Sequence, residues 1–189
     1  MRVIAGEAKG TRLKSPSGLN IRPTADRVKE ALFSIISPNL ADAVFVDLFA
    51  GSGAIGIEAL SRGAERCIFV DKNKKSISLI QKNLAITKFE KRSRVICADI
   101  KKAIKQFEEN ELKANIIFLD PPYNYVDLQN IVRSILNSNI LKENGLVIVE
   151  HDRSNIKWTD SFGVTKQKKY GDTYLTFFYL KTEDIPVKT

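Results

Sequence analysis

Five short apolar segments follow one another from residue 44 onward, separated by longer amphipathic stretches: VFVDLF, CIFVD, RVICAD, NIIFLD and GLVIVE. This alternation is typical of βαβ units, in which buried strands form a parallel sheet and helices cover it. The amphipathic stretches predict helices over residues 54–62, 74–86, 101–109 and 126–137. The pattern therefore favours an α/β fold around one mostly parallel sheet.

The two ends of the chain depart from this alternation. The segments SFGVTKQKKY and TYLTFFYLK predict two strands joined at Gly171–Asp172, which would add an antiparallel hairpin to the sheet. Before residue 40, a Gly-containing segment predicts a small β-hairpin, and a helix is expected from residue 23. We expect a basic N-terminal extension at 1–40, an α/β domain at 41–183 and a tail at 184–189.

A glycine loop follows the first predicted strand, with Gly51, Gly53 and Gly56 spaced as G-x-G-x-x-G. Dinucleotide enzymes, methyltransferases and purely structural turns can all carry this pattern. Asp47 lies four residues before Gly51, where a carboxylate would repel a pyrophosphate and attract a cation. The stretch therefore favours S-adenosylmethionine, which has a sulfonium and an ammonium but no phosphate, over NAD.

Three more acids end predicted strands. Asp71 could accept hydrogen bonds from the hydroxyls of a ribose, which suits either cofactor. Asp99 could accept a hydrogen bond from an adenine amine or cap the next helix. Asp120 closes the fourth strand. Because open α/β sheets bind ligands at the carboxyl ends of their strands, the shared placement of these acids indicates a binding site.

Asp120 begins the segment Asp-Pro-Pro-Tyr. Pro121 and Pro122 have fixed φ angles and no N–H, so this loop is stiff and its carbonyls stay free as acceptors. Tyr123 adds a flat aromatic face. Together these groups could hold a planar base and accept hydrogen bonds from its exocyclic amine, which favours the charge that develops when nitrogen attacks a methyl group. The alternative is a structural turn.

The net charge of +8 predicts an anionic partner, although basic residues also serve solubility. Seven Lys and Arg against three Asp and Glu in the first thirty residues supply four of these eight charges. Candidate contacts to the phosphates of such a partner are Arg2, Lys9, Arg12, Arg22 and Arg27.

Other classes of site have little support in the sequence. Two cysteines, Cys67 and Cys97, cannot form a disulfide framework or a zinc site, and no metal is expected. No apolar run is long enough to cross a membrane, and two cysteines fit a reduced compartment, so we expect a cytoplasmic protein. A small domain with no evident dimer surface suggests a monomer. His151 could be a general base, but a structural role is favoured because proton loss after methyl transfer needs no strong base.

Nearly the whole chain resembles the RsmD family of bacterial small-subunit ribosomal RNA guanine-N2 methyltransferases. The matching segments are RVIAGEAKGTRLKSP, RPTADRVKEALF, DLFAGSGAIGIEALSRGA, LDPPY and YGDTYLTFFYL. The resemblance implies a Rossmann-like class I methyltransferase fold with a seven-stranded sheet, and methyl transfer from S-adenosylmethionine to a guanine in an assembled 30S particle. The implied donor-site residues are Asp47, Gly51, Ser52, Gly53, Asp71 and Asp99, and the implied target-base residues are Asp120, Pro121, Pro122 and Tyr123.

Other functions remain open at this stage. An Asp-Pro-Pro-Tyr loop suits the N6 amine of adenine or the N4 amine of cytosine, in DNA or RNA, as well as it suits guanine. An NAD-linked oxidoreductase and a noncatalytic RNA-binding protein are alternatives from other classes. Fold-level likeness does not decide among them.

Overall fold

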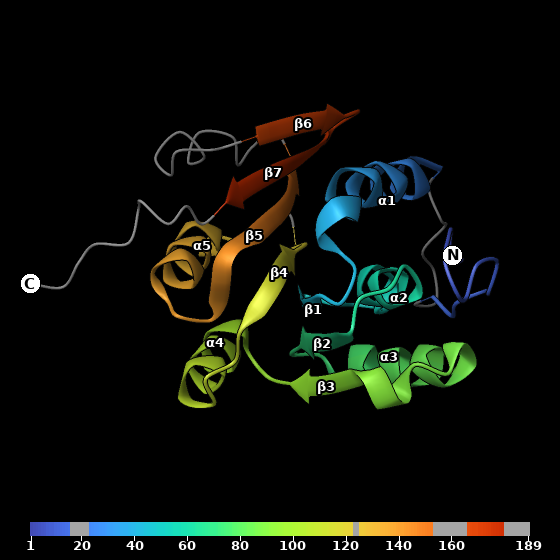
Figure 1. The fold of residues 1–189 in the computed structure, drawn as a ribbon, viewed down its shortest axis with the longest axis horizontal. Coiled ribbons are helices and arrows are strands. Elements are labelled where there is room, and N and C mark those ends of the chain that lie inside the picture. Colours follow the sequence, from blue (N-terminus) through green and yellow to red (C-terminus); the bar gives the residue numbers. More distant parts are fainter. Residues whose placement is uncertain (16–22, 123–124, 153–165, 180–189) are drawn as a thin grey trace, which may run out of the picture.

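The computed structural model describes residues 1–15, 23–122, 125–152 and 166–179. Its centre is a seven-stranded sheet in the order β3-β2-β1-β4-β5-β7-β6 (Figure 1). The first five strands are mutually parallel: β1 (Val44–Leu48), β2 (Arg66–Asp71), β3 (Ser93–Cys97), β4 (Ala114–Leu119) and β5 (Leu141–Asp152). The predicted parallel sheet is confirmed.

The predicted C-terminal hairpin is also confirmed. Strand β6 (Lys166–Tyr170) pairs antiparallel with β7 (Thr173–Tyr179), and β7 pairs antiparallel with β5. The turn at Gly171 has a φ of 62°, a conformation that glycine adopts without steric cost. The hairpin therefore extends the sheet beyond β5.

Helices cover both faces of the sheet (Figure 1). One layer contains α1 (Pro23–Ile36), α2 (Ala54–Ser61) and α3 (Lys74–Thr87), and the other contains α4 (Ile100–Glu109) and α5 (Leu128–Asn137). Short 3-10 turns occur at Ser37–Asn39 and Glu90–Arg92. The predicted helix positions agree with these bounds to within two residues.

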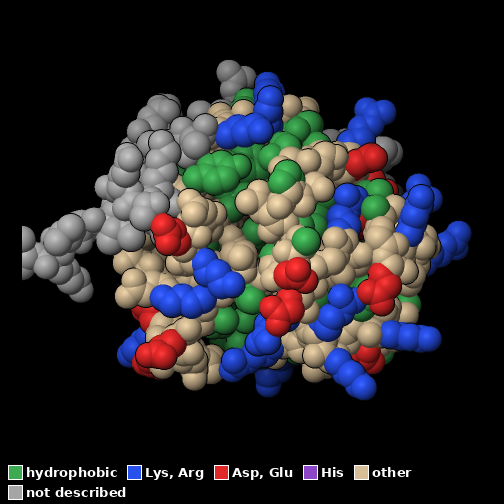
Figure 2. Space-filling view, viewed as in Figure 1, with side chains coloured by type: hydrophobic (Ala, Val, Ile, Leu, Met, Phe, Trp, Pro, Cys, Tyr) green, Lys and Arg blue, Asp and Glu red, His purple; other side chains and the backbone are tan. Residues whose placement is uncertain are grey.

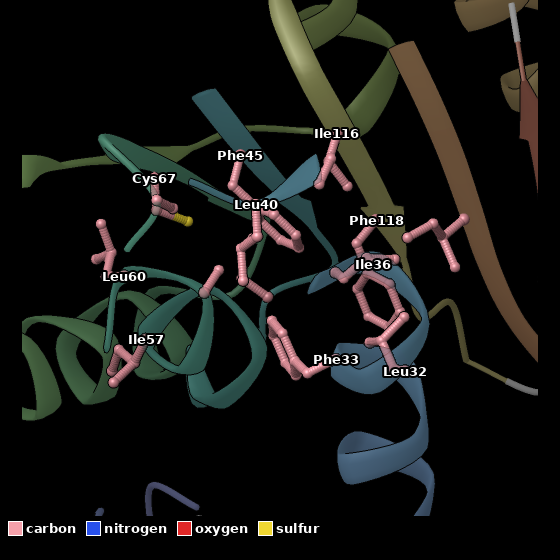
Figure 3. Close-up of a cluster of buried hydrophobic side chains, with 14 of the residues drawn as sticks. Leu32, Phe33, Ile36, Leu40, Phe45, Ile57, Leu60, Cys67, Ile116 and Phe118 are labelled. Carbon is pink, nitrogen blue, oxygen red and sulfur yellow. The ribbon is translucent and has the colours of Figure 1, made fainter. Parts of the chain in front are cut away.

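Alternation along the strands divides the core in two, because successive side chains point to opposite faces. Phe45, Phe118 and Ile148 face the α1–α3 layer, where they pack with α1 residues such as Phe33 and Ile36 (Figure 3). The intervening strand residues pack against α4 and α5. Helix α1 thus belongs to the main core, although it precedes the residue-40 boundary drawn from the sequence.

The N-terminal segment is anchored to α2 by a fully buried carboxylate. Glu58 accepts hydrogen bonds from the backbone N–H groups of Ile4 (2.8 Å) and Ala5 (3.0 Å), and it pairs with Lys29 (3.4 Å) and Arg62 (2.8 Å). The predicted hairpin here contains one antiparallel bridge, Arg2 with Arg12. These contacts hold the start of the chain against the main domain.

Candidate active site

Two adjoining cavities lie at the carboxyl ends of the parallel strands. The larger, about 510 Å³, is lined by residues that include Asp71, Asp99 and Pro121. The smaller, about 220 Å³, includes Asp47, Gly51 and Ser52 in its lining. Three residues line both cavities: Phe49, Asp120 and Glu150. Because β1 has β2 on one side and β4 on the other, the connections diverge here, where such sheets bind ligands.

The glycine loop turns tightly between β1 and α2. Gly51 and Gly53 have φ values of 55° and 78°, which glycine adopts without strain. A Cβ on Gly56 would lie 2.3 Å from Phe69 Cε1 and 2.5 Å from Cys67 Sγ, so this glycine permits close helix–sheet packing. Gly51 lines the smaller cavity, whereas Gly53 lies outside both linings.

The N–H groups of the three glycines in this loop are already hydrogen-bonded within the protein. Gly51 N–H donates to Asp71 Oδ2 at 2.9 Å, and Gly56 N–H donates to Asp47 Oδ2 at 3.0 Å. Gly53 N–H donates to the carbonyl of Ala50 at 2.7 Å. A loop that binds pyrophosphate presents free glycine N–H groups, so the internal bonds of these three glycines favour a ligand without phosphates.

Asp47 is the most deeply buried acid of the site, with 2% of its surface exposed. Burial raises its pKa to about 8; the hydrogen bond from Gly56 opposes this shift, and the neighbouring Asp120 and Asp71 add to it. Because a buried carboxylate is costly to ionise, Asp47 would gain from a cationic ligand in the smaller cavity.

Asp71 ends β2 and uses both carboxylate oxygens to organise the backbone. Besides the bond from Gly51, its Oδ1 accepts a hydrogen bond from Asn73 N–H at 2.8 Å. Each oxygen has a second lone pair, so Asp71 can still accept hydrogen bonds from ligand hydroxyls in the larger cavity.

Asp99 caps helix α4, where its side chain accepts a hydrogen bond from Lys101 N–H at 3.0 Å. The capping role that the sequence left open is therefore present. Asp99 is exposed and also lines the larger cavity, beside Ile100. Its position is compatible with a further hydrogen bond to a ligand.

Asp120 and Pro121 follow β4 and line the larger cavity together with Pro122. The Asp120 side chain is open to solvent through the cavity, yet the dense protein around it raises its pKa. After the prolines, Tyr125 N–H donates to the carbonyl of Pro122 at 2.9 Å, and the Tyr125 ring packs edge-on against Phe49 with centroids 4.9 Å apart. The proline segment is therefore held at the place where the cavities meet.

His151 lies in the lining of the larger cavity, but its ring is buried and engaged. Its Nδ1 is 2.8 Å from the carbonyl oxygen of Asp152, and its Nε2 is 2.8 Å from Thr176 Oγ1. The ring stacks on Tyr174, and burial lowers its pKa. A neutral ring with both nitrogens bonded fits the structural role favoured by the sequence.

The predicted RNA contacts that the structure describes are all exposed: Arg2, Lys9, Arg12 and Arg27. Arg22 and Tyr123 lie outside the described residues. Figure 2 shows basic side chains at many places on the face in view, mainly over its lower and right parts, with acidic ones among them. Lys29, by contrast, is buried against Glu58 and the carbonyl of Arg2, so its charge is not available to an external partner.

Phe49, Tyr125 and Glu150 are among the lining residues that were not predicted from the sequence. Glu150 ends the apolar run GLVIVE, a signal equivalent to that of the four predicted aspartates. Phe49 has a φ of 63°, an uncommon conformation for a bulky residue, which no local pattern in the sequence announces.

Within the described part of the chain, no group of three or more His, Cys, Asp or Glu side chains could hold a metal ion. No helix among these residues is long and apolar enough to cross a membrane.

The chain is similar to known proteins along most of its length. The family described as "Conserved hypothetical protein 95" matches residues 1–179. The Bacillus subtilis protein YlbH is 39% identical, covering 94% of this chain and 98% of its own. Ribosomal RNA small subunit methyltransferase D of Haemophilus influenzae is 33% identical, covering 90% and 89%.

The fold is shared with solved structures as well. The Escherichia coli protein yhhF has a TM-score of 0.81 at 30% identity, covering 96% of this chain and 98% of its own. The predicted fold class, that of the class I S-adenosylmethionine-dependent methyltransferases, is confirmed.

Proposed function

Because this chain belongs to the ribosomal RNA small subunit methyltransferase D family, the RsmD family, we propose that it methylates the exocyclic N2 amine of a guanine in small-subunit ribosomal RNA. The methyl donor is S-adenosylmethionine. The substrate we propose is an assembled small-subunit particle in the cytoplasm.

The residues at the two cavities fit this donor. The glycine loop has its N–H groups bonded internally, and carboxylates line both cavities, so the site suits a ligand with cationic groups and without phosphates. Asp71 and Asp99 would hold the nucleoside end in the larger cavity. Asp47, Gly51 and Ser52 would hold the amino-acid end in the smaller one.

When bound, the donor supplies the activated methyl group. The protein's own part of the chemistry centres on Asp120 and the proline segment, which lie where the cavities meet. Asp120 would accept a hydrogen bond from the target amine and orient its nitrogen. Nitrogen must release a proton as it gains the new bond to carbon, and the raised pKa of Asp120 helps this carboxylate to take that proton.

The exposed basic residues of the N-terminal segment would bind RNA phosphates, which positions the substrate without reading its sequence. Their backbone is held beside the smaller cavity, because Met1, Asp26 and Lys29 contribute to its lining. The proposed RNA-binding segment therefore adjoins the proposed donor site.

The single observation that carries the proposal is the position of Asp120 in the lining of both cavities, with Pro121 and Pro122 next to it in the lining of the larger one. Its test is transfer of labelled methyl groups to small ribosomal subunits that lack their native modifications. Free ribosomal RNA, large subunits and DNA serve as comparison substrates, and nucleoside digestion identifies the product. We expect N2-methylguanosine from small subunits; N6-methyladenosine or N4-methylcytidine would contradict the choice of guanine.

A further inference from the structure

Glu150 lies directly beside Asp120. Strands β4 and β5 are parallel neighbours in which Leu119 pairs with Val149, so the next residues, Asp120 and Glu150, are adjacent across the sheet at the usual strand spacing of about 4.8 Å. Both side chains project to the face that Phe118 and Ile148 occupy two residues earlier. Both line the two cavities, so the carboxylates form a pair at the cavity junction.

This pair differs from the other acids of the site. Among the described residues, neither Asp120 nor Glu150 makes a hydrogen bond or ion pair, whereas Asp47 and Asp71 accept bonds from the glycine loop. Burial raises the pKa of Glu150, and the adjacent Asp120 raises it further. Two adjacent acceptors without donors are suited to a ligand that brings adjacent N–H groups.

Guanine alone among the four RNA bases presents two neighbouring donors, N1–H and the N2 amine, on its Watson–Crick edge. In adenine and cytosine the amine stands next to a ring nitrogen that has a lone pair and no hydrogen, so these bases offer no second donor to an acceptor pair. An acceptor pair therefore favours guanine in two ways: it accepts a hydrogen bond from N1–H, and it disfavours bases that lack this donor.

We propose that Glu150 selects guanine by accepting a hydrogen bond from N1–H of the target base while the neighbouring Asp120 accepts one from its N2 amine. Glu150 is thus a specificity-determining residue in contact with the substrate. This inference rests on the proposed function, since it concerns the base that the enzyme methylates.

The test uses small-subunit particles assembled with 2-aminopurine in place of the target guanine. This base keeps the exocyclic amine at C2 but has an acceptor at N1 instead of N1–H. We expect the wild-type protein to prefer guanine by at least about 100-fold in kcat/KM. The Glu150→Gln variant, whose amide can either accept or donate, should lower this preference to about tenfold or less.

The exposed Glu143 of the same strand provides a matched control, because Glu143→Gln removes one charge away from both cavities and should leave the preference unchanged. The preference is a ratio measured within each variant, so it does not depend on the fraction of folded protein. Because Glu150 also lines the donor cavity, donor affinity is measured by calorimetry for each variant, and the preference is compared at saturating donor.

A Glu150→Gln variant that keeps the full preference for guanine would overturn the inference and leave the proposed function intact. A loss of donor binding that accounts for the whole loss of turnover, with the preference unchanged, would overturn it in the same way. If the wild-type protein forms no N2-methylguanosine in unsubstituted particles, the proposed function fails first, and the role of Glu150 fails with it.

Discussion

The acids of the site fall into two groups that the protein treats differently. Asp47 and Asp71, on β1 and β2, accept hydrogen bonds from the backbone of the glycine loop and its surroundings. The side chains of Asp120, directly after β4, and of Glu150, on β5, have no hydrogen-bond partner among the described residues and line both cavities. The first group stabilises the glycine loop without a ligand, whereas the carboxylate oxygens of the second group can accept hydrogen bonds from a ligand.

The largest effect on turnover should come from the second group, at Asp120. We expect Asp120→Ala to lower kcat by about 100-fold or more, because it removes the acceptor that orients the amine. Donor affinity should change little, since the glycine loop keeps its own hydrogen bonds. Single-turnover methyl transfer with calorimetric donor binding measures both quantities. Full turnover with normal donor binding would show that Asp120 does not act on the amine.

Asp71 should show the opposite division of effects. Asp71→Ala leaves the N–H groups of Gly51 and Asn73 without acceptors, which should lower the free energy of unfolding by about 1–3 kcal/mol. It should also weaken donor binding by about 10- to 100-fold while changing kcat at saturating donor less than Asp120→Ala does. Chemical denaturation and donor titration provide the measurements. Unchanged stability would mean that this carboxylate does not organise the loop.

Much of this arrangement could be predicted from the sequence, and the limit of prediction has a physical basis. The apolar runs locate the strands, and Asp47, Asp71, Asp99 and Asp120 follow from their ends. Which acids become neighbours depends on sheet order, and the pairing of β4 with β5 is a long-range property that no local pattern encodes. The end of the run GLVIVE marks Glu150 as the other runs mark the aspartates, but no local pattern places Glu150 beside Asp120.

Hydrogen bonds from backbone N–H groups to distant carboxylates could not be predicted from the sequence either. The contact of Asp47 with Gly56 requires the helix to dock closely on β2, through the packing of Gly56 on Phe69. The anchoring of Ile4 and Ala5 by Glu58 likewise joins segments more than fifty residues apart. Periodicity predicts which face of a helix is buried, but it does not predict that a buried face includes a carboxylate.

Asp47 of the first group allows a test of whether a carboxylate that favours the donor lowers the free energy of unfolding. Its pKa is about 8 in the folded protein against an ordinary 3.8, so between these values the folded state retains a proton that the unfolded state has lost. The free energy of unfolding of the wild type should therefore fall as pH rises from about 4 to 8.

The Asp47→Asn variant should lose that part of the pH dependence and gain roughly 1–2 kcal/mol of stability near pH 8. Its amide oxygen can still accept the hydrogen bond from Gly56, but the carboxylate that favours a cation is gone. Denaturant unfolding at pH 5 and pH 8, together with donor titration, separates the two effects. A variant that is less stable than wild type at pH 8 would show that the ionised carboxylate is not a burden to the fold.

The smallest effect concerns a region away from both groups of acids. Arg2 and Arg12 face each other across the antiparallel bridge and are exposed, so replacing both with Gln should weaken binding to small-subunit particles by about 3- to 10-fold at low salt. The dependence of affinity on salt should become shallower by about two counterions, whereas donor affinity and the kcat at saturating particles should not change. Lys105→Gln, which removes an exposed charge from α4 outside both cavities, is the control. An unchanged salt slope in the double variant would place the phosphate contacts on other basic residues. The RNA affinity would then come from residues outside the N-terminal segment that adjoins the donor cavity.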